Sequence, residues 1–124
     1  MSFAADWARC APWLDAALAH AGRTHSLSDV QALVEAGEAR FWAGRASALV
    51  AALERDPGER RLLLWLAGGD RAELEDMLLP QAEAWGRACG CRRVLLIGRA
   101  GWERTLKGKG YAPLARVIAK DLTT

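Results

Sequence analysis

The sequence predicts an α+β fold of one domain, residues 1–124, with a mixed sheet. Three observations predict it. Apolar residues recur at helical spacing up to residue 37, which indicates an N-terminal helix pair. Short apolar runs separated by turn residues then continue to residue 69, as in an antiparallel meander. Beyond that point helical stretches alternate with apolar runs, so a helix should connect a pair of parallel strands.

The two N-terminal helices are bounded by ordinary capping residues. We expect the first over residues 3–21, because apolar side chains recur every three or four positions and Gly22 follows. The second should begin after Ser26 or Ser28 and end at Gly37.

Three apolar runs at 39–42, 47–53 and 61–67 should form the meander. Pro57-Gly58 supplies the fixed negative φ and then the positive φ of a type II turn between the last two runs. The third run is apolar without a break, which predicts a central strand buried on both faces.

A helix should follow the third strand. Gly68-Gly69 ends the strand, and Asp70 with Glu73 has the spacing of a capping box. Pro80 removes one backbone donor, so the helix should kink or restart there before it stops at Gly90. The apolar run at 94–97 is then a strand parallel to the third one, because a helical crossover joins them.

The last third should contain a short helix and one more strand. Trp102 and Leu106 lie one turn apart on one face of the helix, and Gly110 ends it. Residues 112–118 are expected to form the last strand, with Pro113 at its start or on an edge.

Charge and cysteine content limit the partners and the cellular compartment that we expect for this protein. The net charge is +2, but residues 1–91 carry −4 and residues 92–124 carry +6. The cationic part could attract a phosphate-bearing partner, or it could face the acidic remainder or solvent. Three cysteines make neither a disulfide framework nor a four-ligand metal site, so we expect a reducing, cytoplasmic setting and no metal. No apolar run is long enough to span a membrane, and we expect no membrane partner.

The order of elements resembles the GNAT acyltransferase fold. Gly68-Gly69, residues 85–91, residues 98–106 and Gly110-Tyr111 are more specifically similar to small GNAT-related proteins of tailed phages and prophages, from about Leu27 onward. The resemblance implies that acetyl-CoA would bind where the strands 62–67 and 94–97 separate, with its pyrophosphate at the helix that opens at Asp70. The candidate cofactor-binding residues are Trp65, Leu66, Gly68, Gly69, Arg71, Arg99 and Arg104.

Each of these candidates has a second interpretation. Gly68-Gly69 could admit a ligand to the backbone or simply make a tight turn. Arg99 and Arg104 could hold a phosphate or carboxylate, or bond to backbone carbonyls at the ends of the strand and helix. Trp102 and Leu106 could stack on a ligand, but aromatic residues at helical spacing are more commonly core.

The sequence departs from the GNAT pattern at two functional positions. The segment 66–71 is a shortened pyrophosphate loop, and the Asp70 carboxylate would repel an anion unless Arg71 compensates. Leu106 stands where many of these enzymes carry a tyrosine that protonates the leaving thiolate. His20 and His25 lie elsewhere in the chain, so the sequence names no catalytic residue.

Three functions follow from these observations. The altered loop and the missing tyrosine favour a divergent homologue that binds a protein partner or serves as an accessory of a phage particle. The alternative is an active N-acetyltransferase that moves acetyl from acetyl-CoA to an amine of a small molecule or protein. Nucleic-acid binding through the cationic third is a weaker alternative, because it has no recognition motif.

Overall fold

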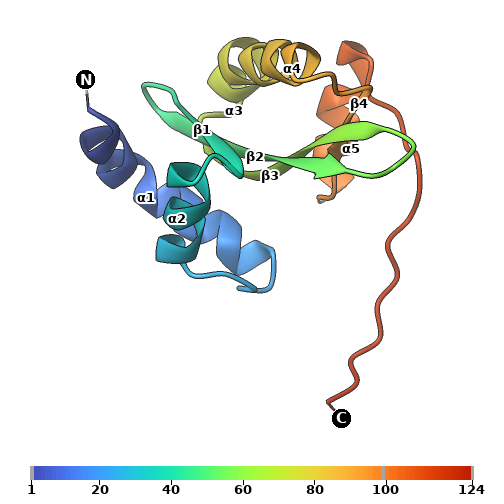
Figure 1. Ribbon diagram of the computed structural model, residues 1–124, viewed down its shortest axis with the longest axis horizontal. Helices are drawn as coiled ribbons and strands as arrows, with labels where there is room; N and C mark the ends of the chain where they lie inside the picture. Colours follow the sequence, from blue (N-terminus) through green and yellow to red (C-terminus); the bar gives the residue numbers. More distant parts are fainter. Residues whose placement is uncertain (1, 99, 124) are drawn as a thin grey trace.

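Four strands form one mixed sheet with helices on both faces in the computed structural model, which describes residues 2–98 and 100–123 (Figure 1). The strands lie side by side in chain order; the first three are antiparallel, and the fourth is parallel to the third. This confirms the predicted mixed sheet and α+β class. The strands are β1 (Ala39–Ala43), β2 (Ser47–Arg55), β3 (Arg60–Gly69) and β4 (Arg93–Leu96).

The N-terminal helices are α1 (Phe3–His20) and α2 (Leu27–Glu35). The Ser26 hydroxyl accepts the Asp29 N–H, and the Asp29 carboxylate accepts the Ser26 N–H, so α2 opens with a full capping box. That backbone bond is the main cause that lowers the pKa of Asp29. Gly22 adopts the positive φ of +83° that ends the predicted first helix.

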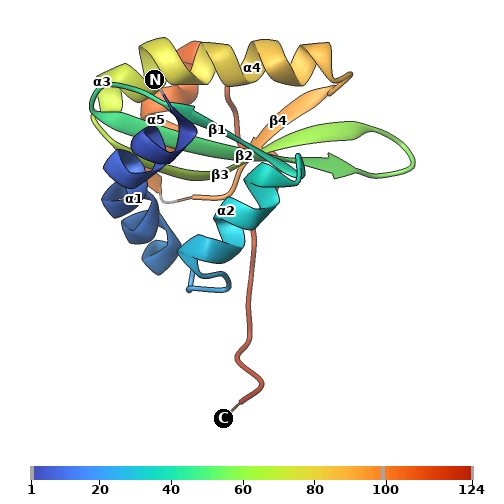
Figure 2. The same cartoon turned by 60° about the vertical axis from the view of Figure 1, so that its left-hand side comes forward.

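The sheet separates two hydrophobic cores. The α1/α2 core lies between these two helices and the sheet. The α4/α5 core lies on the opposite face, beneath α4 (Leu79–Ala88) and α5 (Ala100–Leu106) (Figure 2). The buried members of the α1/α2 core include Cys10, Leu14, Leu18, Val30 and Leu66. Those of the α4/α5 core include Leu62, Leu74, Leu78, Ala82 and Leu106.

A β-bulge at Trp65 changes which face of β3 meets which core. Val50 of β2 pairs with Leu66 and Ala51 pairs with Leu64, so Trp65 is an extra residue without a partner on β2. Leu64 therefore packs in the α4/α5 core and Leu66 in the α1/α2 core, whereas regular alternation would put both on one face.

The parallel strands β3 and β4 separate at this bulge. Their pairing runs from Arg61 with Arg93 to Leu64 with Leu96. β3 then continues to Gly69 without β4 beside it, so a wedge-shaped space opens between the two strand ends.

One continuous helical segment connects β3 to β4. It consists of α3 (Arg71–Glu73), the π-helical turn η1 (Leu74–Leu78) and α4 (Leu79–Ala88). The predicted break at Pro80 takes the form of this wide turn, in which the Leu79 N–H bonds to the Leu74 carbonyl five residues back. The turn precedes Pro80, whose ring would otherwise meet the carbonyl four residues before it. As a result both Leu78 and Leu79 face the core.

Two local expectations were wrong. Gly58 is not among the glycines with positive φ, so the Pro57-Gly58 loop is not a type II turn; the Asp56 N–H and the Glu59 carbonyl close it instead. After α5 (Ala100–Leu106) and the short 3₁₀ turn η2 (Lys107–Lys109), residues 112–118 form no strand. They run away from the body and have no neighbouring strand to pair with (Figures 1 and 2).

The bulge predicts a large stability effect at Leu66. Leu66→Ala should lower the free energy of unfolding by about 2–5 kcal/mol, because it empties a site that is 1% exposed beneath α1. Urea unfolding measures this loss. Met77→Ala, at an exposed helical position, is the matched control and should change stability by less than about 0.5 kcal/mol. Equal losses in both variants would contradict the placement of Leu66.

Candidate functional site

The wedge between the ends of β3 and β4 is the candidate site. Three parts of the chain lie next to it: the corner of residues 68–73, which includes α3, the short helix α5, and the bulge at Trp65. The structure thus brings together Trp65 and the end of α5 at Leu106, which are 41 positions apart in the sequence.

The two glycines of the corner are required by packing within the chain. A Cβ on Gly68 would lie 2.9 Å from the Trp13 carbonyl oxygen of α1. A Cβ on Gly69 would lie 2.3 Å from the Ala46 carbonyl oxygen, and Gly69 also has a φ of +97°. Both positions meet protein backbone, which supports the interpretation of Gly68-Gly69 as a tight turn.

Glu73 joins the start of the helix to the turn between β1 and β2. Its carboxylate accepts the N–H groups of Arg45 at 3.0 Å and Ala46 at 2.9 Å, and it also accepts the hydroxyl of the buried Ser47. The Ser47 bond is the largest cause that lowers the pKa of Glu73, and the Ala46 bond follows. These hydrogen bonds join residues that are 26 to 28 positions apart in the sequence.

The predicted capping box at the corner is therefore half formed. The Asp70 carboxylate accepts the Glu73 N–H at 2.9 Å, as expected. The Asp70 N–H, however, bonds to the Ala46 carbonyl, because Glu73 is held by the β1–β2 turn. Two carboxylates and two occupied N–H groups thus stand where the resemblance places an incoming pyrophosphate.

α5 fills the wedge with apolar side chains. Leu106 is 2% exposed in the α4/α5 core, and Trp102 packs beside it. The remaining cavity has a volume of about 30 Å³, which is room for one or two water molecules. Its lining is almost wholly apolar and comprises Leu49, Leu64, Ala67, Leu74, Glu75, Leu79, Leu96, Trp102 and Leu106.

Arg71 is the predicted site residue that meets α5. Its guanidinium lies 4.3 Å from the centre of the Trp102 ring, which is a cation–π contact between the start of α3 and α5. Arg104 is exposed on α5, apart from this contact, and Arg99 lies outside the described residues.

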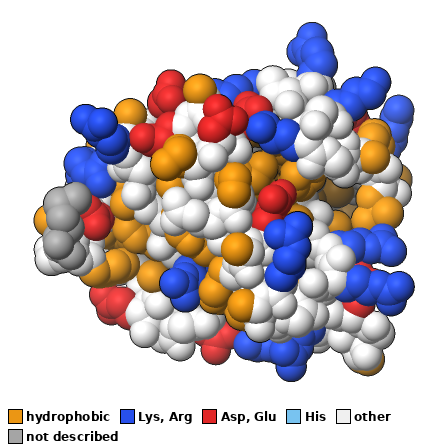
Figure 3. All heavy atoms as spheres, turned by 90° about the horizontal axis from the view of Figure 1, so that it is seen from above, with side chains coloured by type: hydrophobic (Ala, Val, Ile, Leu, Met, Phe, Trp, Pro, Cys, Tyr) orange, Lys and Arg blue, Asp and Glu red, His pale blue; other side chains and the backbone are white. Residues whose placement is uncertain are grey.

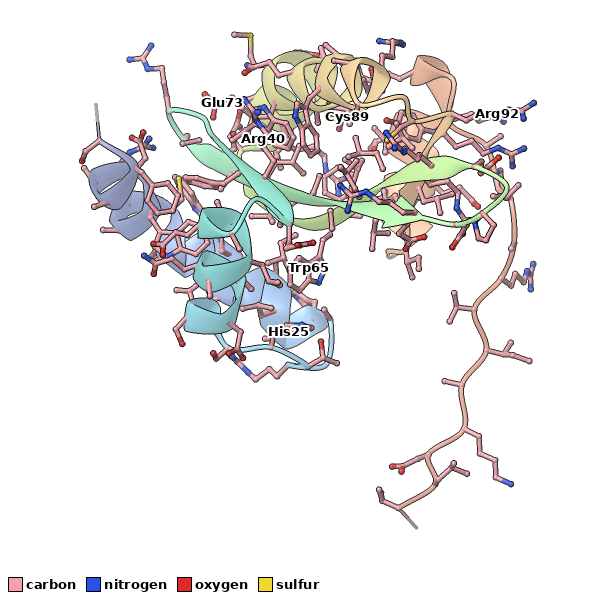
Figure 4. The ribbon with its side chains drawn as sticks, viewed as in Figure 1. His25, Arg40, Trp65, Glu73, Cys89 and Arg92 are labelled. Carbon is pink, nitrogen blue, oxygen red and sulfur yellow. The ribbon has the colours of Figure 1, made fainter. Side chains whose placement is uncertain are left out.

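His25 contacts the bulge at Trp65 on the α1/α2 side of the sheet, opposite to the side that α5 covers. The His25 ring meets the Trp65 ring edge-on, with centroids 4.8 Å apart and planes at 77°. Figure 4 shows both residues on the side of the sheet that α1 and α2 cover, away from Glu73. The Nδ1 atom of His25 is 3.0 Å from the Thr24 hydroxyl, which orients the ring. Sequence reasoning missed His25, because nothing local indicates that the connector before α2 reaches β3.

The structure divides the predicted cofactor residues that it describes among three places. Gly68, Gly69 and Arg71 share the corner, Trp65 and Leu66 pack on the α1/α2 side, and Arg104 is exposed on α5. The Leu66 side chain is buried there, so it does not line the wedge.

The cationic end of the molecule is partly neutralised. Figure 3 shows Lys and Arg side chains along one edge of the α4 face, and Arg92 lies at this end in Figure 4. Within the cationic segment, Arg93 lies 3.7 Å from Glu59, and Lys109 lies 3.2 Å from Asp76. These contacts favour the interpretation that the cationic segment faces the acidic remainder.

Metal binding, membrane insertion and thiol chemistry have little support in the described part of the chain. It holds no group of three or more His, Cys, Asp or Glu side chains arranged to bind a metal ion. None of its helices combines the length and apolar character needed to cross a bilayer. All three cysteines carry free thiols, and burial raises the pKa of Cys10 and of Cys91.

Comparisons with known proteins identify the fold. No family model matches the chain, and no curated protein matches it in sequence. Among solved structures, the tetramutant of the BH1408 protein from Bacillus halodurans matches with a TM-score of 0.65 and 14% identity, over 94% of this chain and 92% of that one. A predicted acetyltransferase from Clostridium acetobutylicum, solved with acetyl-CoA, matches with a TM-score of 0.64 and 9% identity, over 77% and 72%.

A plant N-acetyltransferase matches the chain at a similar level. Glucosamine-6-phosphate N-acetyltransferase from Arabidopsis thaliana matches with a TM-score of 0.63 and 9% identity, over 77% of this chain and 76% of that one. At these identities the likeness shows the fold alone. The chain has the GNAT fold of these acetyltransferases, as its order of elements predicts.

The Glu73 contacts predict a pH-dependent contribution to stability. Because folding lowers the pKa of Glu73, its stabilisation is present above the ordinary value of 4.5 and is lost as the pH falls through the lowered value. Glu73→Gln should therefore unfold at a lower urea midpoint than the wild type at pH 7, and the difference should shrink in acid. Glu38→Gln, at an exposed site, is the control and should match the wild type throughout. A difference that does not change with pH would contradict this role.

Proposed function

We propose that this protein is a divergent homologue of GNAT acyltransferases that acts by binding a partner, without acetyl transfer. The observation that carries the proposal is the filling of the wedge by Trp102 and Leu106. Where the resemblance places the arm of acetyl-CoA, about 30 Å³ remains. A coenzyme would have to displace a side chain that is 2% exposed.

The corner supports the same proposal. Phosphates bind at a helix start when its backbone N–H groups are available and no negative charge opposes them. Here the Asp70 and Glu73 N–H groups are bonded within the protein, and both side chains are carboxylates. Arg71, the cation of this corner, lies over Trp102.

The class of partner follows from the resemblance to small proteins of tailed phages and prophages. We infer a protein partner, and an accessory role in a phage particle or in the host cell that produces it. Mass spectrometry of purified particles from a host that carries this gene would test the association. A constant number of copies per particle would support it, and the chain's absence from particles would count against it.

A coenzyme titration tests the central claim. Acetyl-CoA and free CoA should leave the thermal midpoint of the wild type unchanged, because the wedge is occupied. Leu106→Ala should lose about 2–5 kcal/mol of stability and open the wedge, so that either coenzyme raises its midpoint. Leu18→Ala, equally buried in the α1/α2 core, is the matched control and should gain nothing from coenzyme. Stabilisation of the wild type by about 2.7 kcal/mol at 100 times the dissociation constant would overturn the proposal.

A second candidate function, N-acetyl transfer to an amine, is favoured by His25. An imidazole held at the bulge where β3 and β4 separate could take the proton from an attacking amine. In this function α5 would move to admit acetyl-CoA, and the amine would approach from the His25 side. Water or another residue would protonate the departing thiolate, because Leu106 cannot.

The two functions differ in one assay. If the chain is an enzyme, thiol release from acetyl-CoA should accelerate with a small-molecule or peptide amine. His25→Gln should then lower the rate about 100-fold or more. His20→Gln, at the end of α1, is the control and should retain the rate. A lack of amine-dependent thiol release would exclude this candidate.

A further inference from the structure

We propose that Arg55, Arg60 and Arg92 bind the phosphate backbone of a double-helical nucleic acid. The three side chains come from β2, β3 and the residue before β4, and we call them the arginine row. Only Arg92 belongs to the cationic segment of residues 92–124. The proposal is independent of coenzyme binding and of a protein partner.

The pairing of the strands places the three arginines next to one another. Arg55 lies directly opposite Arg60 in the antiparallel pair of β2 and β3. The Arg92 N–H donates to the Arg60 carbonyl at 2.8 Å, one position before the parallel pair of Arg61 with Arg93. Because neighbouring strands are about 4.8 Å apart, the arginine row crosses three strand positions and is about 10 Å long.

The arginine row lies on the face of the sheet that α4 covers. Leu62 and Val94, two positions after Arg60 and Arg92, both pack in the α4/α5 core, so the alternation of side chains gives the two arginines the same face. Arg55 shares that face because it is directly opposite Arg60.

The end of α4 borders the arginine row. The Arg60 guanidinium donates to the Cys89 carbonyl at 2.9 Å, where α4 ends. Burial is the main cause that raises the pKa of Cys91, and the positive charges of Arg60 and Arg55 oppose that shift, so both guanidinium groups lie close to this end. Arg92 extends outward there (Figure 4).

The acidic side chains of this end are paired with a different arginine. Arg61, on the other face of the sheet, forms ion pairs with all three acids of the hairpin, Glu54, Asp56 and Glu59. Among the described residues, no acid forms an ion pair with the arginine row. Like charges directly opposite each other destabilise a sheet, and a bound anion would relieve that repulsion.

The surroundings favour a nucleic acid over an acidic protein. Protein interfaces have an apolar centre with aromatic anchors, whereas interfaces with DNA are more polar and strongly positive. Of the large apolar side chains that are exposed in the described part of the chain, none lies in residues 50–62 or 80–96, which form this end. The tail, which carries four of them, runs away from α4 (Figure 2).

A double helix fits this surface better than a single strand. Proteins that bind single strands stack the bases on accessible aromatic rings. The exposed aromatic ring among the described residues is that of Phe3, on α1. A double helix needs only backbone contacts, and arginine forks match its phosphates. Each strand carries one phosphate per 3.4 Å of axis, so a row of about 10 Å meets about three phosphates.

The salt dependence of DNA binding tests the proposal. Fluorescence anisotropy of a labelled DNA duplex should show that the logarithm of the association constant falls with the logarithm of the salt concentration, with a slope of at least about −2.7 for three neutralised phosphates. The double variant Arg55→Gln and Arg92→Gln should bind more weakly and reduce this slope by about 1.8. Arg60 is left unchanged because it also bonds to Cys89.

Arg45→Gln is the matched control. Arg45 is exposed in the turn before β2, at the opposite end of that strand from Arg55, so this variant should keep the slope of the wild type. A wild type that does not bind the duplex at low salt would overturn the proposal. A double variant that keeps the wild-type slope would overturn it as well.

Two further measurements exclude other roles for the arginine row. The thermal midpoint of the double variant should equal or exceed that of the wild type, because repulsion of Arg60 is removed. A lower midpoint would show a structural role and reject the proposal. Polyglutamate of the same total charge, and a DNA single strand of the same length, should both bind more weakly than the duplex, because they release fewer counterions. Equal or tighter binding of either one would also reject it.

Discussion

The bulge at Trp65 is the constraint on which the rest of this structure depends. β3 must serve two cores, and one extra residue lets it present Leu64 to one and Leu66 to the other. The same residue ends the pairing with β4, because a strand that changes its phase cannot keep a regular parallel register. The wedge, the burial of Leu106 within it and the approach of His25 to Trp65 all follow from that local irregularity.

At the corner after the bulge, the chain's own groups occupy the place where the resemblance puts a phosphate. Glycines that would let a backbone approach a phosphate here let it approach Trp13 and Ala46. An acidic side chain takes the place of an anion: the Glu73 carboxylate receives two backbone N–H groups and one hydroxyl. The chain has the fold of the acetyltransferases, and the negative charge at this corner is supplied by its own side chain.

The helices and strands could be predicted from the sequence better than the contacts between them. Periodicity and capping residues located α1, α2 and the strands, because those signals depend on near neighbours such as Ser26 and Asp29. The bulge was hidden in a run of leucines, since an unbroken apolar strand gives no sign of which face each residue takes. The partners of Glu73 and His25 lie 26 to 40 residues away in sequence, beyond any local pattern. Residues 112–118 have the composition of a strand, but composition does not provide a neighbouring strand.

The π turn at Leu74–Leu78 divides the helical segment after β3 into two halves that face the sheet independently. The first half is fixed by Glu73 at the β1–β2 turn, and the second by Gly86, which packs closely on Leu62 of β3. One residue of an α-helix corresponds to a rotation of about 100°. The extra residue of the turn therefore sets the angle between these two attachments. We therefore expect the length of this segment to be under tight constraint, because removing one residue would turn Leu79 and Ala82, which are both buried, out of the core together.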